Sequence, residues 1–211
     1  MIVYALGGSV FTENLDKLEE YADFFGSLDE QVVIVTGAGK LKENILAAEK
    51  VANQSELDLI GIQATRLNAE TLKTAMDSHP AIPETIDQVQ EAASTGENVV
   101  MGGLVPGYST DAVAATVAEL LEGKLVIATS VEGVYTADPE EEDTEKYGSI
   151  TVEELRDLTE GNNSAGKHDL IDRTALDIID RSDIETEVVL GTPENLKSSE
   201  FDGTRIVPEQ G

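Results

Sequence analysis

Short apolar runs alternate with longer amphipathic stretches along the whole chain. The apolar runs are nearly continuous, which is typical of strands buried on both faces of a sheet. The stretches between them carry apolar residues at helical spacing, as at Leu15, Leu18, Tyr21, Ala22 and Phe25. The apolar runs predict strands over 2–6, 31–35, 97–101, 124–128 and 187–190, and a final edge strand over 205–207.

Helices are predicted between these strands. The clearest helix start is Ser109-Thr110-Asp111, because small polar residues accept hydrogen bonds from the free N–H groups of a first turn. A polar, acidic stretch over 133–147 is predicted to be a loop, too short to separate two domains. The predicted helices cover 12–28, 41–52, 59–76, 84–93, 112–121, 152–159 and 169–181.

This alternation predicts an α/β fold with a mostly parallel sheet covered on both faces. A chain of 211 residues suffices for one such domain with a substantial core, so residues 1–211 are expected to form a single domain. Aromatic residues make up only 4% of the chain and Trp is absent. The core must therefore consist mainly of Val, Ile, Leu and Ala.

Composition excludes several classes of protein. The chain has no cysteine, so disulfides, thiol catalysis and cysteine-based zinc sites are excluded. No apolar run approaches the roughly 20 residues that span a bilayer. The first residues, 1–6, lack the basic region of a signal peptide and lead directly into glycines. We therefore expect a cytoplasmic protein.

The charge of the chain is strongly negative. Asp and Glu total 42 against 14 Lys and Arg, which gives a net charge of −28. Duplex nucleic acid and anionic membranes are not expected as partners, because phosphate contacts need a basic surface. Charge repulsion of this kind destabilises a compact state, and salt screens it. We hypothesise a salt-adapted protein from a halophile; a merely acidic mesophilic protein is the alternative.

Glycine-rich turns follow three of the predicted strands. They are Gly7-Gly8-Ser9, Gly37-Ala38-Gly39-Lys40 and Gly102-Gly103. Ligands of open α/β sheets bind at the carboxyl ends of strands, and glycine lets the backbone approach a phosphate closely. Neither a Walker A pattern nor a Rossmann fingerprint is present. The three turns therefore predict a phosphate-binding cleft of another type.

Five segments of the chain resemble motifs of the archaeal UMP kinases, in the amino acid kinase superfamily, and they occur in the order in which that family carries them. The segments are 7–9, 39–41, 61–69, 101–114 and 129–139. The resemblance implies a three-layer α/β/α sandwich and transfer of the ATP γ-phosphoryl group to UMP with Mg²⁺. It also implies a homohexamer, an acceptor site in the N-terminal part and an ATP site from about residue 124.

The resemblance also implies roles for individual residues. Phosphoryl transfer depends on positioning and charge neutralisation, so cations near the glycine turns are candidates for catalysis. Lys40 and Arg66 are such candidates, and Asp111 would orient a cation or a metal. The residues implied for ATP are Gly8, Ser9, Gly39, Lys42, Thr129, Tyr135 and Asp138. Those implied for UMP are Ala38, Asp58, Leu104, Val105, Pro106, Gly107, Tyr108, Ser109 and Thr110.

Each charged or aromatic candidate also has a simpler interpretation. Lys40 could simply be solvent-exposed without contacting a phosphate, and Arg66 could simply pair with an acid. Asp111 could be no more than a first-turn acid that interacts favourably with the dipole of its helix. Asp58 could be an ordinary solvated acid, and Tyr135 could pack in the core. The metal ligands stay unassigned.

The chain departs from the family pattern at several positions. Tyr4-Ala5 stands where many superfamily kinases carry a lysine, so Lys40 would share that function. Ala38 replaces a glycine of the second turn. Lys42-Glu43 stands where an arginine is common, and lysine cannot reproduce the bidentate contact of arginine. Glu132 replaces the usual Asp.

Other functions remain possible on the same fold. One is a sibling kinase for a small phosphate such as isopentenyl phosphate, although the histidine expected near the second turn is absent. Another is a non-catalytic binder, like the molybdate or tungstate storage proteins, and a third is a nucleotide sensor. Lys40 and the segment 129–139 favour an enzyme.

Overall fold

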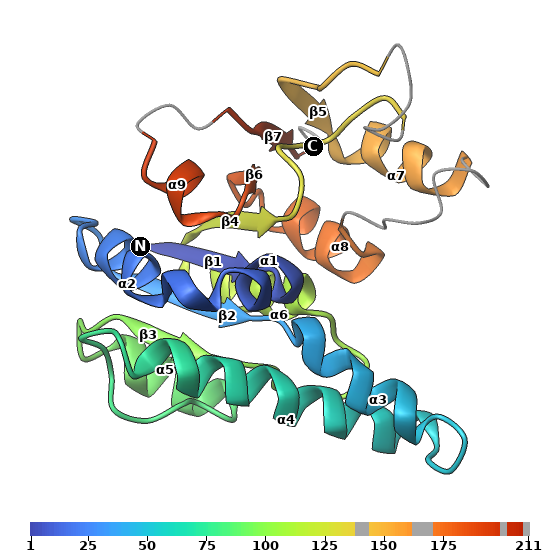
Figure 1. The fold of residues 1–211 in the computed structure, drawn as a ribbon. Coiled ribbons are helices and arrows are strands. Elements are labelled where there is room, and N and C mark those ends of the chain that lie inside the picture. The colour runs from blue at the N-terminus through green and yellow to red at the C-terminus, as the bar shows by residue number, and fades with distance from the viewer. Residues whose placement is uncertain (138–143, 162–170, 199–201, 209–211) are drawn as a thin grey trace.

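The computed structural model describes residues 1–137, 144–161, 171–198 and 202–208. A seven-stranded sheet in the order β3-β2-β1-β4-β6-β7-β5 forms its middle layer, and helices cover both faces (Figure 1). The predicted three-layer α/β/α architecture with a mostly parallel sheet is confirmed.

Five of the strands run parallel and form the first part of the sheet. Every residue of β2 is buried, which explains why its first four residues, 32–35, are all apolar. The register places Ala5 of β1 between Val35 of β2 and Ile127 of β4. These five strands are β1 Ile2–Leu6, β2 Val32–Thr36, β3 Val99–Met101, β4 Lys124–Thr129 and β6 Thr186–Leu190.

The last part of the sheet differs from the sequence prediction. Strand β7, Thr204–Val207, pairs antiparallel with β6, and β5, Ser149–Thr151, pairs parallel with the other side of β7. The prediction that residues 205–207 form the edge strand is therefore wrong. Strand β5 occupies the edge, and with three residues it is too short to give a recognisable apolar pattern.

Two apolar cores lie on the two faces of the sheet. One packs beneath α5 Ile86–Ala93, α6 Thr110–Leu121, α7 Val152–Gly161 and α8 Arg173–Arg181. The other packs beneath α1 Gly8–Glu13, α2 Leu18–Gly26, α4 Gln54–Lys73 and α9 Pro193–Leu196. Helix α3, Lys42–Ala48, packs against α4. Among the described residues, no helix is both long and apolar enough to cross a membrane.

The single helix predicted over 12–28 is divided in the structure. Helix α1 ends at Glu13, a 3₁₀ turn covers Leu15–Lys17, and α2 follows. Asn14 adopts a non-helical backbone conformation, and its side-chain amide donates to Val10 O at 2.7 Å. Such local side-chain bonds compete with helix continuation, which explains the break.

Helix α4 begins five residues before the predicted start. Asn53 Oδ1 accepts from the Glu56 amide at 3.1 Å, and Glu56 Oε2 accepts from the Asn53 amide at 2.8 Å. This reciprocal pair is a capping box, which satisfies two otherwise free donors and starts the helix at Gln54.

Candidate active site

The carboxyl ends of the five parallel strands lie on the same side of the sheet, at the end where these strands stop (Figure 1). Backbone hydrogen bonds join the turns that follow these strands. The Gly37 amide donates to Leu6 O at 3.0 Å, and the Gly7 amide donates to Ala128 O at 2.7 Å. The glycine turns thus lie side by side, as the sequence predicts.

The first two turns are packed backbone against backbone. A Cβ atom on Gly8 would lie 2.1 Å from the Gly39 nitrogen, and one on Gly39 would lie 2.1 Å from Gly8 O. Gly39 also has a φ of +54°, which disfavours other residues. Both positions therefore require glycine, and Ser9 is exposed directly beside them.

Helix α4 fixes the second turn from behind. The buried Asn68 amide donates to Gly37 O at 2.7 Å and to Ala38 O at 3.1 Å. The sequence interpretation gave Asn68 no role, although the residue lies in the segment 61–69 that resembles a family motif. Its contact is visible only once α4 is placed beside the turn.

The third turn also rests on α4. Thr65 Oγ1 accepts from the Gly103 amide at 2.7 Å, and a Cβ atom on Gly102 would lie 2.7 Å from the Arg66 nitrogen. The guanidinium of Arg66 pairs with Glu84 at 2.7 Å, while its Nε donates to Gly103 O at 3.2 Å. This geometry matches the simpler interpretation of Arg66, as a partner of an acid.

Residues 104–110 link the third turn to helix α6. Val105 and Tyr108 are exposed, and Gly107 has a φ of +82°. At the end of the segment, Thr110 Oγ1 would lie 3.2 Å from a Cβ atom on Gly37. The implied acceptor segment, which also includes Leu104, Pro106 and Ser109, therefore reaches the second glycine turn.

Asp58 lies in the first half of α4, one turn before Ile62. Ile62 borders the third turn, since a Cβ atom on Gly103 would lie 3.2 Å from its side chain. Asp58 is half-buried and accepts from the Gln54 amide at 2.9 Å. The ribose contact implied for Asp58 stays a prediction.

Asp172 joins the starts of helices α6 and α8. Its Oδ1 accepts from the Thr174 amide at 2.8 Å, and its Oδ2 accepts from the hydroxyl of Ser109. The Ser109 hydroxyl in turn accepts from the Ala112 amide at 3.0 Å. The sequence interpretation missed Asp172, because its partner lies 63 residues away.

Asp111 lies in the first turn of α6 and is partly buried. The pKa of its carboxyl is raised from 3.8 to about 7, mainly by burial and also by the nearby Asp172 carboxylate, while Lys42 acts in the opposite direction. Near neutral pH, Asp111 therefore exchanges a proton readily. Perturbed groups of this kind concentrate at functional sites.

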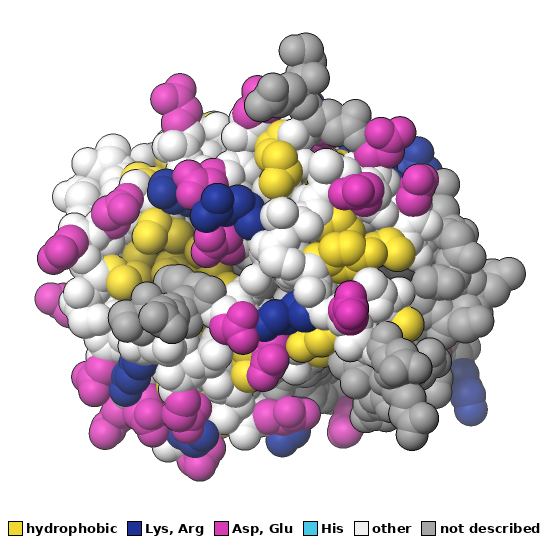
Figure 2. Space-filling model, turned by 90° about the horizontal axis from the view of Figure 1, so that it is seen from above, with side chains coloured by type: hydrophobic (Ala, Val, Ile, Leu, Met, Phe, Trp, Pro, Cys, Tyr) yellow, Lys and Arg dark blue, Asp and Glu magenta, His cyan; other side chains and the backbone are white. Residues whose placement is uncertain are grey.

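The lysines beside the second turn differ from most cations of the chain. Most of the other lysines and arginines in the described part of the chain pair with carboxylates, as in Lys146–Asp202 at 2.7 Å and Arg156–Asp177 at 2.9 Å. Figure 2 shows such basic side chains among acidic ones on one face of the molecule. Within the described part of the chain, the side chains of Lys40 and Lys42 make no ion pair. Their positive charge remains available to an anion.

The amino acid kinase family model matches residues 1–189. The chain belongs to the amino acid kinase family. It is 39% identical to the uridylate kinase of Methanococcus vannielii, over 98% of this chain and 99% of that protein. It is also 39% identical to the uridylate kinase of Haloarcula marismortui, over 99% of each chain.

A solved structure gives the same result. The crystal structure of uridylate kinase from Archaeoglobus fulgidus superposes with a TM-score of 0.88 at 40% identity, covering 98% of this chain and 99% of that one. UMP kinase from Ureaplasma parvum, with a TM-score of 0.80 and 20% identity, shares the fold. The predicted family is thereby confirmed.

Three of the residues implied for ATP, namely Thr129, Tyr135 and Asp138, lie in the C-terminal half of the chain. Thr129 ends β4, beside the first turn. Tyr135 is half-buried, and its hydroxyl donates to Glu132 at 3.3 Å. The buried hydroxyl of Thr204 fixes the segment before Tyr135, because it accepts from the Val134 amide at 2.9 Å. The implied Asp138 lies outside the described residues.

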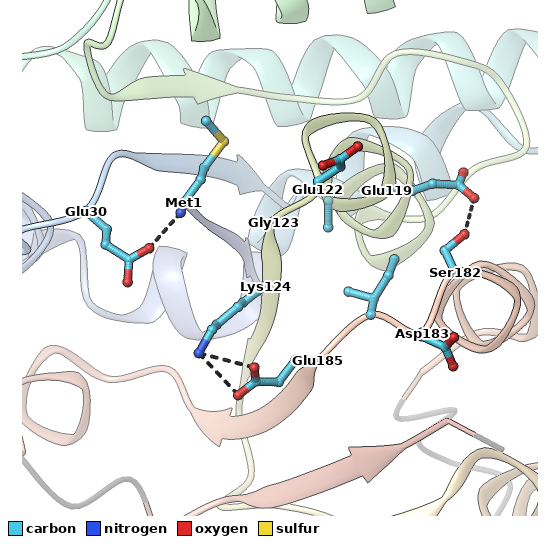
Figure 3. A pocket seen from close by; sticks show the side chains of 11 residues that line it. Met1, Glu30, Glu119, Glu122, Gly123, Lys124, Ser182, Asp183 and Glu185 are labelled. Atoms are coloured by element: carbon cyan, nitrogen blue, oxygen red, sulfur yellow. Dashed lines mark hydrogen bonds and ion pairs between the residues drawn. The ribbon is translucent and has the colours of Figure 1, made fainter. Parts of the chain in front are cut away.

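A separate hollow lies at the opposite end of the parallel strands, where β1 and β4 begin (Figure 3). Its volume is about 400 Å³. The N-terminal amine of Met1 pairs with Glu30 at 2.6 Å, and Lys124 pairs with Glu185 at 3.2 Å. These cations are already paired with carboxylates, and the glycine turns lie at the opposite end of the strands. The hollow therefore does not coincide with the phosphate site that the glycine turns predict.

Proposed function

We propose that this protein transfers the γ-phosphoryl group of ATP to UMP and releases UDP and ADP. The observation that carries the proposal is the close backbone contact between Gly8 and Gly39, beside Lys40 and Lys42, which make no ion pair within the described residues. The names of the relatives, which match over nearly their full length at 38–39% identity, support UMP as the acceptor.

Phosphoryl transfer requires aligned substrates and neutralised charge rather than a covalent intermediate. Glycines at positions 8 and 39 allow phosphates to approach the backbone, where amide groups can donate to them. Lys40 and Lys42 would add positive charge at the same place. Backbone and lysine together supply the preorganised donors that this chemistry needs.

The two nucleotides are assigned to the two halves of the site. ATP would lie over the first turn and extend towards Thr129 and Tyr135. UMP would lie against Ala38, Asp58 and the segment 104–110, with its phosphate towards the second turn. This arrangement brings the acceptor oxygen and the γ-phosphate together above Gly8 and Gly39.

A magnesium ion fits this site best as a partner of ATP. Among the described residues there is no group of three or more potential metal ligands. Magnesium commonly uses one or two carboxylates together with substrate phosphates, and Asp111 and Asp172 form a suitable pair. The bound ion would neutralise phosphate charge, while Asp111 would orient Lys42 or the ion.

We further propose that the protein forms a homohexamer and acts on soluble nucleotides in the cytoplasm. Large apolar side chains are exposed on α3 and α4, namely Leu46 (60%), Leu59 (52%) and Leu67 (57%). Exposed apolar clusters commonly mark protein interfaces. A contact between copies through α3 and α4 would bury them.

Release of ADP, measured by a coupled assay in molar KCl, tests the function. UMP, CMP and isopentenyl phosphate are compared as acceptors, and UMP is expected to give the fastest release. A faster reaction with isopentenyl phosphate would indicate a sibling kinase. If no acceptor stimulates ADP release, the protein is a binder or a nucleotide sensor and the proposal is wrong.

Lys40→Ala tests the catalytic assignment. We expect kcat to fall by on the order of 10²-fold, as when one preorganised transition-state donor is removed. Lys50→Ala is the matched control, because Lys50 is also exposed, makes no ion pair within the described residues and lies beyond the end of α3. Equal activities for the two variants would remove Lys40 from the mechanism.

A further inference from the structure

Thr12 forms an unusual link between helix α1 and the second glycine turn. It lies in the last turn of α1, and its side chain is only 6% exposed. Its hydroxyl donates to Gly8 O at 2.8 Å and accepts from the backbone amide of Lys40 at 3.1 Å. One hydroxyl therefore connects both turns that are expected to meet the phosphates.

The geometry around this hydroxyl leaves little freedom. A Cβ atom on Gly39 would lie 2.4 Å from Thr12 Oγ1, so the turn passes directly over the threonine. Because the hydroxyl proton is directed to Gly8 O, a lone pair remains for the Lys40 amide. Without this acceptor, the amide would lose its hydrogen bond, and the turn would lose a contact that fixes its path.

The Lys40 side chain makes no ion pair within the described residues, so none of these residues holds its ammonium group by charge. Its direction depends on the backbone from which it projects. Strand β1 contains no lysine that could share this function, and it carries the buried Tyr4. The path of the Lys40 backbone therefore determines where the positive charge of the Lys40 side chain lies in the site.

We propose that Thr12 is a positioning residue, which holds the Lys40 backbone so that its ammonium group faces the transferred phosphoryl group. The inference rests on the proposed function. Thr12 itself touches neither substrate, because its hydroxyl is occupied by two backbone groups. In this role its effect on catalysis passes through the Lys40 backbone, and this distinguishes it from a residue that merely stabilises α1.

Thr12→Val and Thr12→Ser form the test pair. Valine keeps the shape but removes the hydroxyl, and we expect kcat to fall about 10-fold or more, since misplacement of a catalytic group by about 1 Å can cost up to 10²-fold. KM for UMP should change less than threefold. Serine restores the hydroxyl and should return kcat to within about threefold of wild type.

A double-mutant cycle separates positioning from general damage. In the Lys40→Ala background, Thr12→Val should have almost no further effect on kcat, because the group that it positions is absent. Amide hydrogen exchange of the peptide covering 37–42 should accelerate in Thr12→Val and remain slow in Thr12→Ser. This exchange readout requires no catalytic activity.

Two results would overturn the inference. One is wild-type kcat in Thr12→Val; the other is a full additional loss from Thr12→Val in the Lys40→Ala background. Failure of the proposed function looks different, because the wild-type protein itself would then show no UMP-dependent ADP release. The exchange experiment would in that case still report whether Thr12 holds the turn.

Discussion

Asp111→Asn is expected to stabilise the protein above neutral pH while impairing catalysis. The unfolded chain releases the Asp111 proton near pH 3.8, whereas the folded protein holds it up to about pH 7. Between these values the folded state binds more protons, so the wild type loses stability as the pH rises. Asparagine has a similar shape but no charge, and it removes this dependence.

The size of the effect follows from the difference between the two pKa values. A gap from 3.8 to about 7 corresponds to about 4 kcal/mol at a pH above both. Asp111 is partly accessible to water, which reduces this value, so we expect a gain of about 2 kcal/mol at pH 8. The gain should shrink steadily below about pH 7 and vanish below about pH 4, where both states are protonated.

Urea unfolding at constant KCl, repeated from pH 4 to pH 8.5, measures this gain. Asp23→Asn is the control, because Asp23 is exposed on α2 and its substitution should change stability by less than about 0.5 kcal/mol at any pH. A pH-independent difference between Asp111→Asn and wild type, or destabilisation at pH 8, would refute the reasoning. Loss of UMP-dependent ADP release at pH 8, despite the higher stability, would mark Asp111 as functional.

Two further predictions concern charge and assembly. With a net charge of −28, the free energy of unfolding should rise steeply between dilute buffer and molar KCl, because salt screens the repulsion among carboxylates. Thermal melts in a KCl series measure this rise. Full stability in dilute buffer would argue against salt adaptation. If the proposed hexamer forms through α3 and α4, Leu67→Asp on α4 should shift it to smaller species in sedimentation velocity. An unchanged sedimentation coefficient would place the interface elsewhere.

The strands that lead into the glycine turns were predictable because burial on both faces makes them largely apolar. Strand β2, with all five residues buried, is the clearest case. The short edge strand β5 and the break at Asn14 were not predictable in the same way. The first carries too few residues for a periodic signal, and the second depends on a single side-chain bond to Val10 O.

The arrangement of the glycine turns was also predictable, since parallel strands end at a common edge. The residues that fix these turns were not. Asn68, Thr12 and Asp172 act through contacts between elements far apart in the sequence, across 31, 28 and 63 residues. Their residue types do not indicate which distant group each side chain binds, so only the packed structure reveals their partners.

The different situations of Lys40 and Arg66 show what decides the role of a cation in so acidic a chain. By residue type, Arg66 is the better phosphate ligand, because its guanidinium can bind two oxygens at once. Yet Glu84 and Gly103 O already occupy that group, and a phosphate would have to displace both. Lys40 has no such competitor among the described residues. Where acidic residues outnumber basic ones by 42 to 14, a lysine beside a glycine turn that makes no ion pair with the described residues is therefore more informative than the intrinsic strength of the cation.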